Sequence, residues 1–304
     1  MQSVFDELYE NSLAKCEFKN LISIITAEEN IRLAYRNLKK NAGSRTPGTD
    51  GKTIADLAKM SEPELIGFVQ QKFNWYQPQS VRRKEIPKGN GKTRPLGIPT
   101  IMDRLIQQCV LQVMEPICEA KFCETSNGFR PNRGVENALA QAEKHMQKSN
   151  LHIVIDIDIK GFFDNVNHGK LLRQIWTMGI HDKKLLSIIS AMLKAEVAGI
   201  GFPEKGTPQG GILSPLLSNI VLNELDWWIT SQWVGMPTRH EYSGKIHENG
   251  TKDQSKKYRE LRKTNLKECY IVRYADDFKI FCRKHSDAVK LFEATRAWLK
   301  ERLG

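Results

Sequence analysis

Alternation of apolar and polar residues predicts a few β-strands in a chain that is otherwise mostly helical. In HIVIDIDIKGFF, the isoleucines alternate with Val154, Asp156 and Asp158, which predicts a strand with one apolar face. CYIVRYADDFKIFCR (269–283) predicts a strand pair around two aspartates. The basic segment 81–100 predicts a hairpin whose turn is Lys-Gly-Asn-Gly.

Helical spacing of apolar residues predicts most of the other elements. Thr26 and Glu29 form a capping-box pattern, so we expect one helix over 20–40. Ser214 followed by Pro215 is typical of a helix start. The other helices are expected over 62–73, 101–120, 134–148, 169–176, 182–195 and 214–230 and, capped by Ser286, to Leu303.

Two segments lack an apolar period. GSRTPGTDG (43–51) is rich in Gly, Pro and Thr, which predicts a loop. Residues 237–268 contain nine Lys or Arg against five acids, so we expect an irregular insertion on the surface. The order of strands and helices predicts an α+β fold.

Composition narrows the class of protein. A hydrophobic content of 40% in 304 residues is enough for a substantial core. The net charge of +11 favours a polyanionic partner, nucleic acid before membrane, although an ordinary basic enzyme would have the same balance. We find no apolar run that could span a bilayer and no signal peptide, so we expect a cytoplasmic protein without a membrane partner. The six cysteines lack the spacing of a metal or redox motif and are expected to be reduced and mostly buried.

The chemistry is predicted to lie at the aspartates. Asp276 and Asp277 repel each other within an apolar hairpin, and a cation between them would relieve that repulsion, although a plain polar turn is the alternative. Asp158 ends another strand, on the face away from the isoleucines. Side by side in one sheet, the two strands would bring three carboxylates together for hard cations such as Mg²⁺. Asp156 shares that face, and we do not expect it to be a ligand.

At these residues the chain resembles a known family. DIKGFFD (158–164) and RYADDF (273–278) resemble the two aspartate boxes of reverse transcriptases. TPQGGILSPLLSNIVLNELD (207–226) resembles the PQG box of the group II intron-encoded members, the maturases. Further similarity to that family's finger and N-terminal motifs lies in RPLGIPTIMDRLIQQ (94–108), NGFRPNRGVENAL (127–139) and GSRTPGTDG. Six boxes in the family's order are a specific signal, whereas a lone Ala-Asp-Asp would be weak.

The resemblance implies a right-hand polymerase with fingers and palm, whose antiparallel palm sheet carries packed helices. It implies an N-terminal extension with an RNA-binding loop over 1–50, part of the fingers over 51–150 and the palm over 151–304. In the family, the helix after the YADD box continues into further palm and a helical thumb. The resemblance therefore implies a fingers-and-palm fragment without a thumb, which we expect to polymerise weakly.

The implied activity is RNA-directed DNA polymerisation. The substrates would be an intron RNA template, a DNA primer and deoxynucleotide triphosphates, and Asp158, Asp276 and Asp277 would hold two Mg²⁺ ions for in-line displacement. The family's steric gate falls on Phe163, where a ring would crowd a 2′-hydroxyl. Core packing is the alternative for Phe163.

Three further residues are implied to contact the incoming nucleotide. Gln209 would lie near its sugar, unless it is an ordinary turn residue. Lys92 and Arg94 would contact the triphosphate, unless they belong to a solvated basic face. RNA backbone contacts, with the same alternative, are expected from Arg82, Arg83, Lys84, Lys88, Lys256, Lys257, Arg259, Arg262 and Lys263.

Other functions stay open. The protein could chiefly be a splicing cofactor that binds its own intron RNA, and the family combines this role and intron mobility with polymerisation. A viral RNA-dependent RNA polymerase would more naturally carry Gly-Asp-Asp and a small residue at position 163. Retron-type enzymes share the YADD box, but the PQG and FRPNRG boxes favour the intron family. A homodimer is possible.

Overall fold

The chain folds into two compact units, each made of two stretches of sequence. The computed structural model describes residues 1–87, 91, 93–242, 244–248, 250 and 252–303. Unit 1 comprises Met1–Phe122 and Lys160–Val221, and unit 2 comprises Cys123–Ile159 and Leu222–Gly304. The predicted segments 1–50, 51–150 and 151–304 divide the chain differently and stay a prediction. Within the described residues, no helix is both long and apolar enough to cross a membrane.

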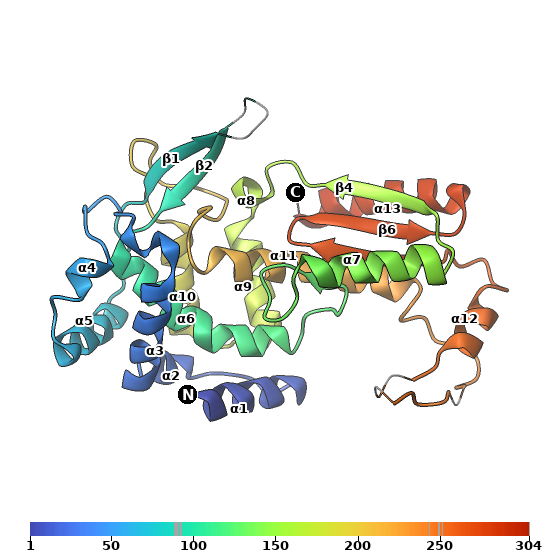
Figure 1. Ribbon diagram of the computed structural model, residues 1–304, viewed down its shortest axis with the longest axis horizontal. Coiled ribbons are helices and arrows are strands. Elements are labelled where there is room, and N and C mark those ends of the chain that lie inside the picture. The colour runs from blue at the N-terminus through green and yellow to red at the C-terminus, as the bar shows by residue number, and fades with distance from the viewer. Residues whose placement is uncertain (88–90, 92, 243, 249, 251, 304) are drawn as a thin grey trace. The chain divides into compact units, whose positions relative to one another are not determined.

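Unit 1 is mainly helical and is built around α6 (Ile101–Glu119) (Figure 1). Most of α6 is buried, and α1, α2 and α3 pack against it. The β1–β2 hairpin precedes α6, with Arg82 opposite Ile98 in its antiparallel register. The elements of this unit are α1 (Gln2–Leu13), α2 (Leu21–Ile25), α3 (Glu28–Lys40), η1 (Ala42–Arg45), α4 (Ile54–Leu57), α5 (Glu62–Asn74), β1 (Arg82–Pro87), β2 (Thr93–Ile98), α6, α8 (Phe162–Asn165), α9 (His168–Thr177), α10 (Lys183–Leu193) and the start of α11 (Ser214–Gln232).

The single helix predicted over 20–40 is wrong. The structure has α2 and α3 in its place, separated by Thr26 and Ala27. The Thr26 hydroxyl donates to the Ile22 carbonyl at 2.8 Å, four residues back, and does not cap α3. Thr26 therefore closes one helix, and Ala27 begins the next from an extended conformation.

Unit 2 contains a four-stranded sheet in the order β3-β5-β6-β4. The β5–β6 and β6–β4 pairs are antiparallel, as predicted, but β3 pairs with β5 in parallel, so the sheet is mixed. Within the described residues, the strands and helices of this unit are β3 (Ser126–Asn127), α7 (Val135–Glu143), the π-helix η2 (Lys144–Lys148), β4 (Ile153–Asp158), the remainder of α11 from Leu222, α12 (Ser255–Leu261), β5 (Cys269–Tyr274), β6 (Asp277–Cys282) and α13 (His285–Leu303).

The two faces of this sheet differ in chemistry. Strand register places Val154 opposite Phe281, Asp156 opposite Lys279 and Asp158 opposite Asp277, all on one face. Ala138 and Ala142 of α7 pack against this face at Leu151, Val272 and Phe281. The other face carries the β4 isoleucines with buried residues of β5 and β6, and α13 packs behind β4 and β6 (Figure 1). The predicted alternation of β4 is therefore confirmed.

Residues 237–268 are not wholly irregular, because α12 lies within them. The Tyr258 ring stacks on Trp233 with the ring centroids 6.1 Å apart. Trp233 in turn donates from Nε1 to the Tyr270 hydroxyl at 3.0 Å. The insertion is therefore packed onto the rest of unit 2 through the Tyr258 ring, which the count of charges did not predict.

The predicted helix starts and the predicted state of the cysteines can also be compared with the structure. α11 begins at Ser214 and α13 at His285, so Ser214 and Ser286 lie inside these helices; the Ser214 hydroxyl donates to the Pro208 carbonyl at 2.8 Å. All six cysteines are free thiols, and only Cys16 is exposed, as predicted for most of them. Burial raises the pKa of Cys109 and of three other thiols, which keeps them protonated and unreactive.

We predict that Phe281→Ala lowers the free energy of unfolding by about 3–5 kcal/mol, because the ring is 1% exposed and packs against Leu151 and Val272. Phe292→Ala removes a ring that is 39% exposed on α13 and should cost less than about 1 kcal/mol. Urea denaturation of both variants measures the difference. Equal losses would show that the Phe281 ring does not contribute as a core residue.

Candidate active site

The candidate catalytic aspartates meet at one end of the unit 2 sheet. Asp158 of β4 and Asp277 of β6 are direct partners in the antiparallel register. Such partners have Cβ atoms about 4.5–5.5 Å apart and point to the same face. Asp276 precedes Asp277 in the two-residue turn after Tyr274. The predicted side-by-side placement of the two strands is therefore confirmed.

The three carboxylates are neighbours but do not form a finished ligand set. Asp158 and Asp277 are exposed and Asp276 is half-buried. Among the residues that the structure describes, no three His, Cys, Asp or Glu side chains are gathered so that they could hold a metal ion. Oxygen-only donors on an exposed face fit the chemistry of a hard cation such as Mg²⁺. The metal role of these aspartates stays a prediction.

Lys279 lies on the same face as the aspartates. Its Nζ is 2.7 Å from Asp156 Oδ1 and 3.7 Å from Asp277 Oδ1. The hydrogen bond to Asp156, with the charges of both aspartates, raises the pKa of Lys279. Asp156 is thus paired with a lysine, which agrees with its expected exclusion from the ligand set. The lysine also offsets part of the repulsion among the acids.

Unit 1 holds the predicted nucleotide-contacting residues. The loop that precedes α11 and contains Pro208, Gln209 and Gly210 is called the PQG loop below. Together with the β1–β2 hairpin it lines a pocket of about 270 Å³, to which Arg83, Lys205 and Gln209 contribute. The Gly97 amide of β2 donates to the Gln209 carbonyl at 2.6 Å. Gly210 has a φ of +116°, and a Cβ there would lie 2.5 Å from the Gly97 carbonyl oxygen. Only glycine allows this close contact between the loop and the hairpin.

The structure also brings Phe163 to the PQG loop. The Phe163 carbonyl accepts from the Thr207 amide at 2.7 Å. Its ring is half-buried and lies 5.4 Å from that of Phe162, which is 6% exposed. Phe162 therefore takes the core position and leaves part of the Phe163 ring accessible. Phe163 does not line the pocket that contains Gln209.

The other finger cations have different surroundings. Arg94 is exposed on β2 opposite Ile86 and does not line the pocket. Lys88 and Lys92 lie outside the described residues. Arg83 Nε pairs with Glu85 Oε1 at 2.9 Å, whereas Lys84 is exposed. Arg82 is half-buried, and its Nε has no hydrogen-bond partner within the described part of the chain.

The cations of the insertion are partly neutralised. Lys257 Nζ donates to the Val234 carbonyl at 2.7 Å. Arg262 pairs with Glu268 at 2.7 Å and Lys263 with Glu260 at 2.9 Å. The insertion's other two predicted RNA contacts are exposed, namely Lys256 and Arg259, the latter 3.9 Å from Glu260. Arg262 and Lys263 are exposed as well, so these cations differ in how close a carboxylate lies to them and not in their accessibility.

Sequence reasoning missed two residues that hold the PQG loop. Gln107 Oε1 accepts from the Ile212 amide at 2.8 Å, and His168 Nε2 donates to the Gly206 carbonyl at 2.7 Å. Gln107 is 7% exposed on a helix whose buried residues are mostly apolar. A polar residue at an apolar position was an available signal for Gln107. Nothing in the spacing indicated His168.

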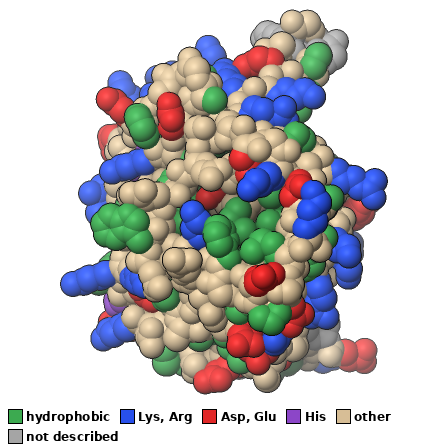
Figure 2. Space-filling view, turned by 90° about the vertical axis from the view of Figure 1, so that its left-hand side faces the viewer, with side chains coloured by type: hydrophobic (Ala, Val, Ile, Leu, Met, Phe, Trp, Pro, Cys, Tyr) green, Lys and Arg blue, Asp and Glu red, His purple; other side chains and the backbone are tan. Residues whose placement is uncertain are grey.

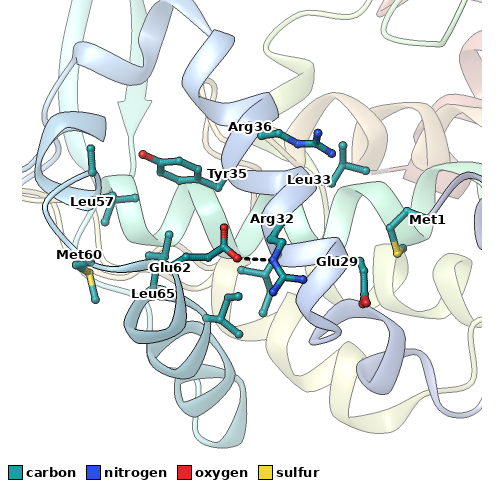
Figure 3. A pocket seen from close by; sticks show the side chains of 13 residues that line it. Met1, Glu29, Arg32, Leu33, Tyr35, Arg36, Leu57, Met60, Glu62 and Leu65 are labelled. Atoms are coloured by element: carbon teal, nitrogen blue, oxygen red, sulfur yellow. Dashed lines mark hydrogen bonds and ion pairs between the residues drawn. The ribbon is translucent and has the colours of Figure 1, made fainter.

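Unit 1 has another hollow, which is not at the candidate site. Its face in Figure 2 is hollowed around hydrophobic side chains, with charged side chains around them. A pocket of about 650 Å³ lies between α3, α4 and α5 (Figure 3). Leu57 and Leu65 line it, and the Arg32–Glu62 ion pair of 2.6 Å crosses it. None of the predicted site residues contributes to it, so its volume alone does not identify the active site.

Comparisons with known proteins agree with this geometry. Residues 86–303 match the family described as reverse transcriptase (RNA-dependent DNA polymerase). Protein YkfC of Escherichia coli strain K12 is 34% identical over 275 residues, which cover 87% of this chain and 71% of that protein. Group II intron-encoded protein LtrA of Lactococcus lactis subsp. cremoris is 37% identical over 240 residues, covering 75% and 38%. The putative COX1/OXI3 intron 2 protein of Saccharomyces cerevisiae is 27% identical over 340 residues, covering 99% and 38%.

The chain thus spans well under half the length of the two intron-encoded relatives and most of the length of YkfC. The family match covers most of the chain and includes both aspartate strands and the PQG loop. The chain therefore belongs to the reverse transcriptase (RNA-dependent DNA polymerase) family, and group II intron-encoded proteins are among its relatives.

Proposed function

We propose that the protein is the RNA-directed DNA polymerase of a group II intron, which copies RNA into DNA from deoxynucleotide triphosphates. The observation that carries the proposal is the register of β4 and β6, which sets Asp158 opposite Asp277 with Asp276 in the adjoining turn. Membership of the reverse transcriptase family supports it. The intron-encoded relatives support the link to introns.

In this proposal Asp158, Asp276 and Asp277 hold two Mg²⁺ ions. When bound, the ions supply activation of the primer 3′-hydroxyl and stabilisation of the leaving pyrophosphate in an in-line displacement. The exposed carboxylates supply oxygen donors and leave room for substrate phosphates. Lys279 keeps Asp156 away from that set through its 2.7 Å contact.

The nucleotide would be selected by residues of unit 1. We assign Phe163 the role of steric gate, because Phe162 fills the core and leaves part of the Phe163 ring accessible. Gln209 would face the sugar from a loop whose backbone is held by Gly97 and Gln107. Arg94, with Lys92, would contact the triphosphate through charge-assisted hydrogen bonds.

A second role, binding of the intron RNA to assist splicing, is favoured by one specific observation. Lys256 and Arg259 project from the insertion as exposed cations, while α12 is packed onto unit 2 by Tyr258. The chain's net charge of +11 suits a polyanion, and the names of the intron-encoded relatives agree with such a partner.

Asp276→Asn should reduce primer extension on an RNA template by on the order of a hundredfold or more, because even a metal misplaced by about 1 Å has that effect. Stability should change by less than about 0.5 kcal/mol, since the side chain lies in a turn and keeps its volume. Asp156→Asn is the matched control, on the same face but paired with Lys279, and should retain activity. Unchanged extension by Asp276→Asn would refute the metal assignment.

Phe163→Ala should raise ribonucleotide incorporation relative to deoxynucleotides by at least about tenfold, because the truncation opens space for the 2′-hydroxyl. Phe162→Ala should instead lower the free energy of unfolding by about 3–5 kcal/mol and leave sugar selectivity unchanged. Competition between the two nucleotide types, measured beside thermal unfolding, separates the roles. A destabilised Phe163→Ala variant with normal selectivity would assign Phe163 to the core.

The double variant Lys256→Gln/Arg259→Gln should bind structured RNA more weakly. The log–log salt slope of binding should fall in magnitude by about 1.4, which corresponds to two phosphate contacts. Lys263→Gln removes one cation and should have a smaller effect, because the Glu260 carboxylate lies 2.9 Å from Lys263 Nζ but 3.9 Å from Arg259 Nε. Filter binding across a salt series measures all three proteins. A slope that the double variant leaves unchanged would mean that these two residues are only solvated.

A further inference from the structure

A buried ion pair lies beneath the hairpin that carries Asp276 and Asp277. Arg273 of β5 and Asp226 of α11 are both 0% exposed. Arg273 Nε lies 2.9 and 3.1 Å from the two Asp226 oxygens, and Nη2 lies 2.7 Å from Oδ2. This two-pronged geometry fixes the plane of the guanidinium, which a single contact would not do.

The same guanidinium reaches the turn itself. Arg273 Nη1 donates to the Ala275 carbonyl at 2.6 Å, and Nη2 donates to Ser126 Oγ at 2.5 Å. On the other side, the Ala275 amide donates to the Asn127 carbonyl at 3.0 Å. Both backbone groups of Ala275 are therefore bonded, the amide to β3 and the carbonyl to the buried guanidinium. Asp276 is the next residue in the chain.

Ala275 needs such support because of its backbone conformation. Its φ is +57°, a left-handed value that residues with a side chain adopt rarely and at a cost in energy. Gly128 packs directly against this turn, since a Cβ there would lie 3.0 Å from the Ala275 nitrogen and 3.1 Å from the Tyr274 ring. The turn is thus held in a strained form by contacts from β3 and from the ion pair.

We propose that Arg273 and Asp226 are positioning residues that hold the Ala275–Asp276 turn in the form that presents Asp276 and Asp277 to metal ions. Neither residue would touch substrate or metal. Alternation along β5 and β6 places Arg273 on the opposite face from Asp277. The inference rests on the proposed function, in which these aspartates are the metal ligands.

A role in stability alone explains this geometry poorly. Burial raises the pKa of the Asp226 carboxyl, and the Arg273 guanidinium offsets part of that effect. Two charges removed from water in this way often stabilise a fold no more than apolar residues of the same volume would. What apolar residues could not supply is the hydrogen bond to the Ala275 carbonyl.

The hairpin offers a matched control at its other end. Glu268, which precedes β5, is 5% exposed and pairs with Arg262 at 2.7 Å and Arg283 at 2.5 Å. These three residues lie at the open end of the same two strands, the end opposite the turn. Glu268→Gln should therefore lower stability without altering the turn.

The test compares Arg273→Lys, Asp226→Asn and Glu268→Gln with the unsubstituted protein. Arg273→Lys keeps the charge but loses the planar fork, and Asp226→Asn keeps the volume but loses the charge. Three quantities are measured: thermal unfolding, hydrogen exchange of the peptide that spans 270–280 without metal, and binding of Mn²⁺ alone by electron paramagnetic resonance. We expect Arg273→Lys and Asp226→Asn to speed exchange in that peptide and to weaken Mn²⁺ binding about 10- to 100-fold.

Glu268→Gln should change neither turn exchange nor Mn²⁺ binding, even with an equal loss of thermal stability. Normal exchange and normal Mn²⁺ binding in both variants of the ion pair would overturn the proposal, as would the same defects in Glu268→Gln. If Arg273→Lys does not fold, Asp226→Asn alone decides. Asp276→Asn, measured in parallel, tests the proposed function separately: unaltered Mn²⁺ binding there refutes the metal assignment, whereas turn exchange still reports on Arg273.

Discussion

The ion pair between Arg273 and Asp226 is the constraint on which the shape of the β5–β6 hairpin depends. The pair is fully buried, and its guanidinium also holds the carbonyl of the strained turn residue Ala275. A β-hairpin can be closed by many turns, and a tight turn usually has glycine or asparagine at a left-handed position. Here alanine takes that position, so tertiary contacts hold the turn in place of local preference. The next two residues of the chain are the proposed metal ligands.

Alternation along the strands lets one sheet serve two purposes. One face is filled by isoleucines and by the buried arginine, and the other presents Asp158, Asp277 and Lys279. Because successive side chains of a strand point to opposite faces, residues that pack in the core alternate with residues that present charged groups. In unit 1, backbone contacts fix the position of the PQG loop. The loop lies against β2 at Gly97 and Gly210, where neither residue has a side chain.

Charge on this protein has more than one use. Its excess of cations suits nucleic acid, yet Lys263 and Arg262 pair with carboxylates of their own segment. The insertion illustrates how composition misleads: its charge count suggests a solvated loop, but Tyr258 packs it onto unit 2. Burying an aromatic ring removes a large apolar area from water and stabilises the packing, whereas exposed ion pairs contribute little to stability.

The sequence by itself determined the alternation of β4, the hairpin around Asp276 and Asp277, and the order of the boxes, because these depend on residue spacing within one segment. Local pattern failed where partners are distant in the chain. The parallel pairing of β3 with β5, the contact of Lys279 with Asp156 and the buried pair of Arg273 with Asp226 all required the fold. A single arginine in a strand creates no hydrophobic pattern that sequence analysis could interpret. Its partner Asp226 lies 47 residues away in the chain, and only the packing of α11 brings the two together.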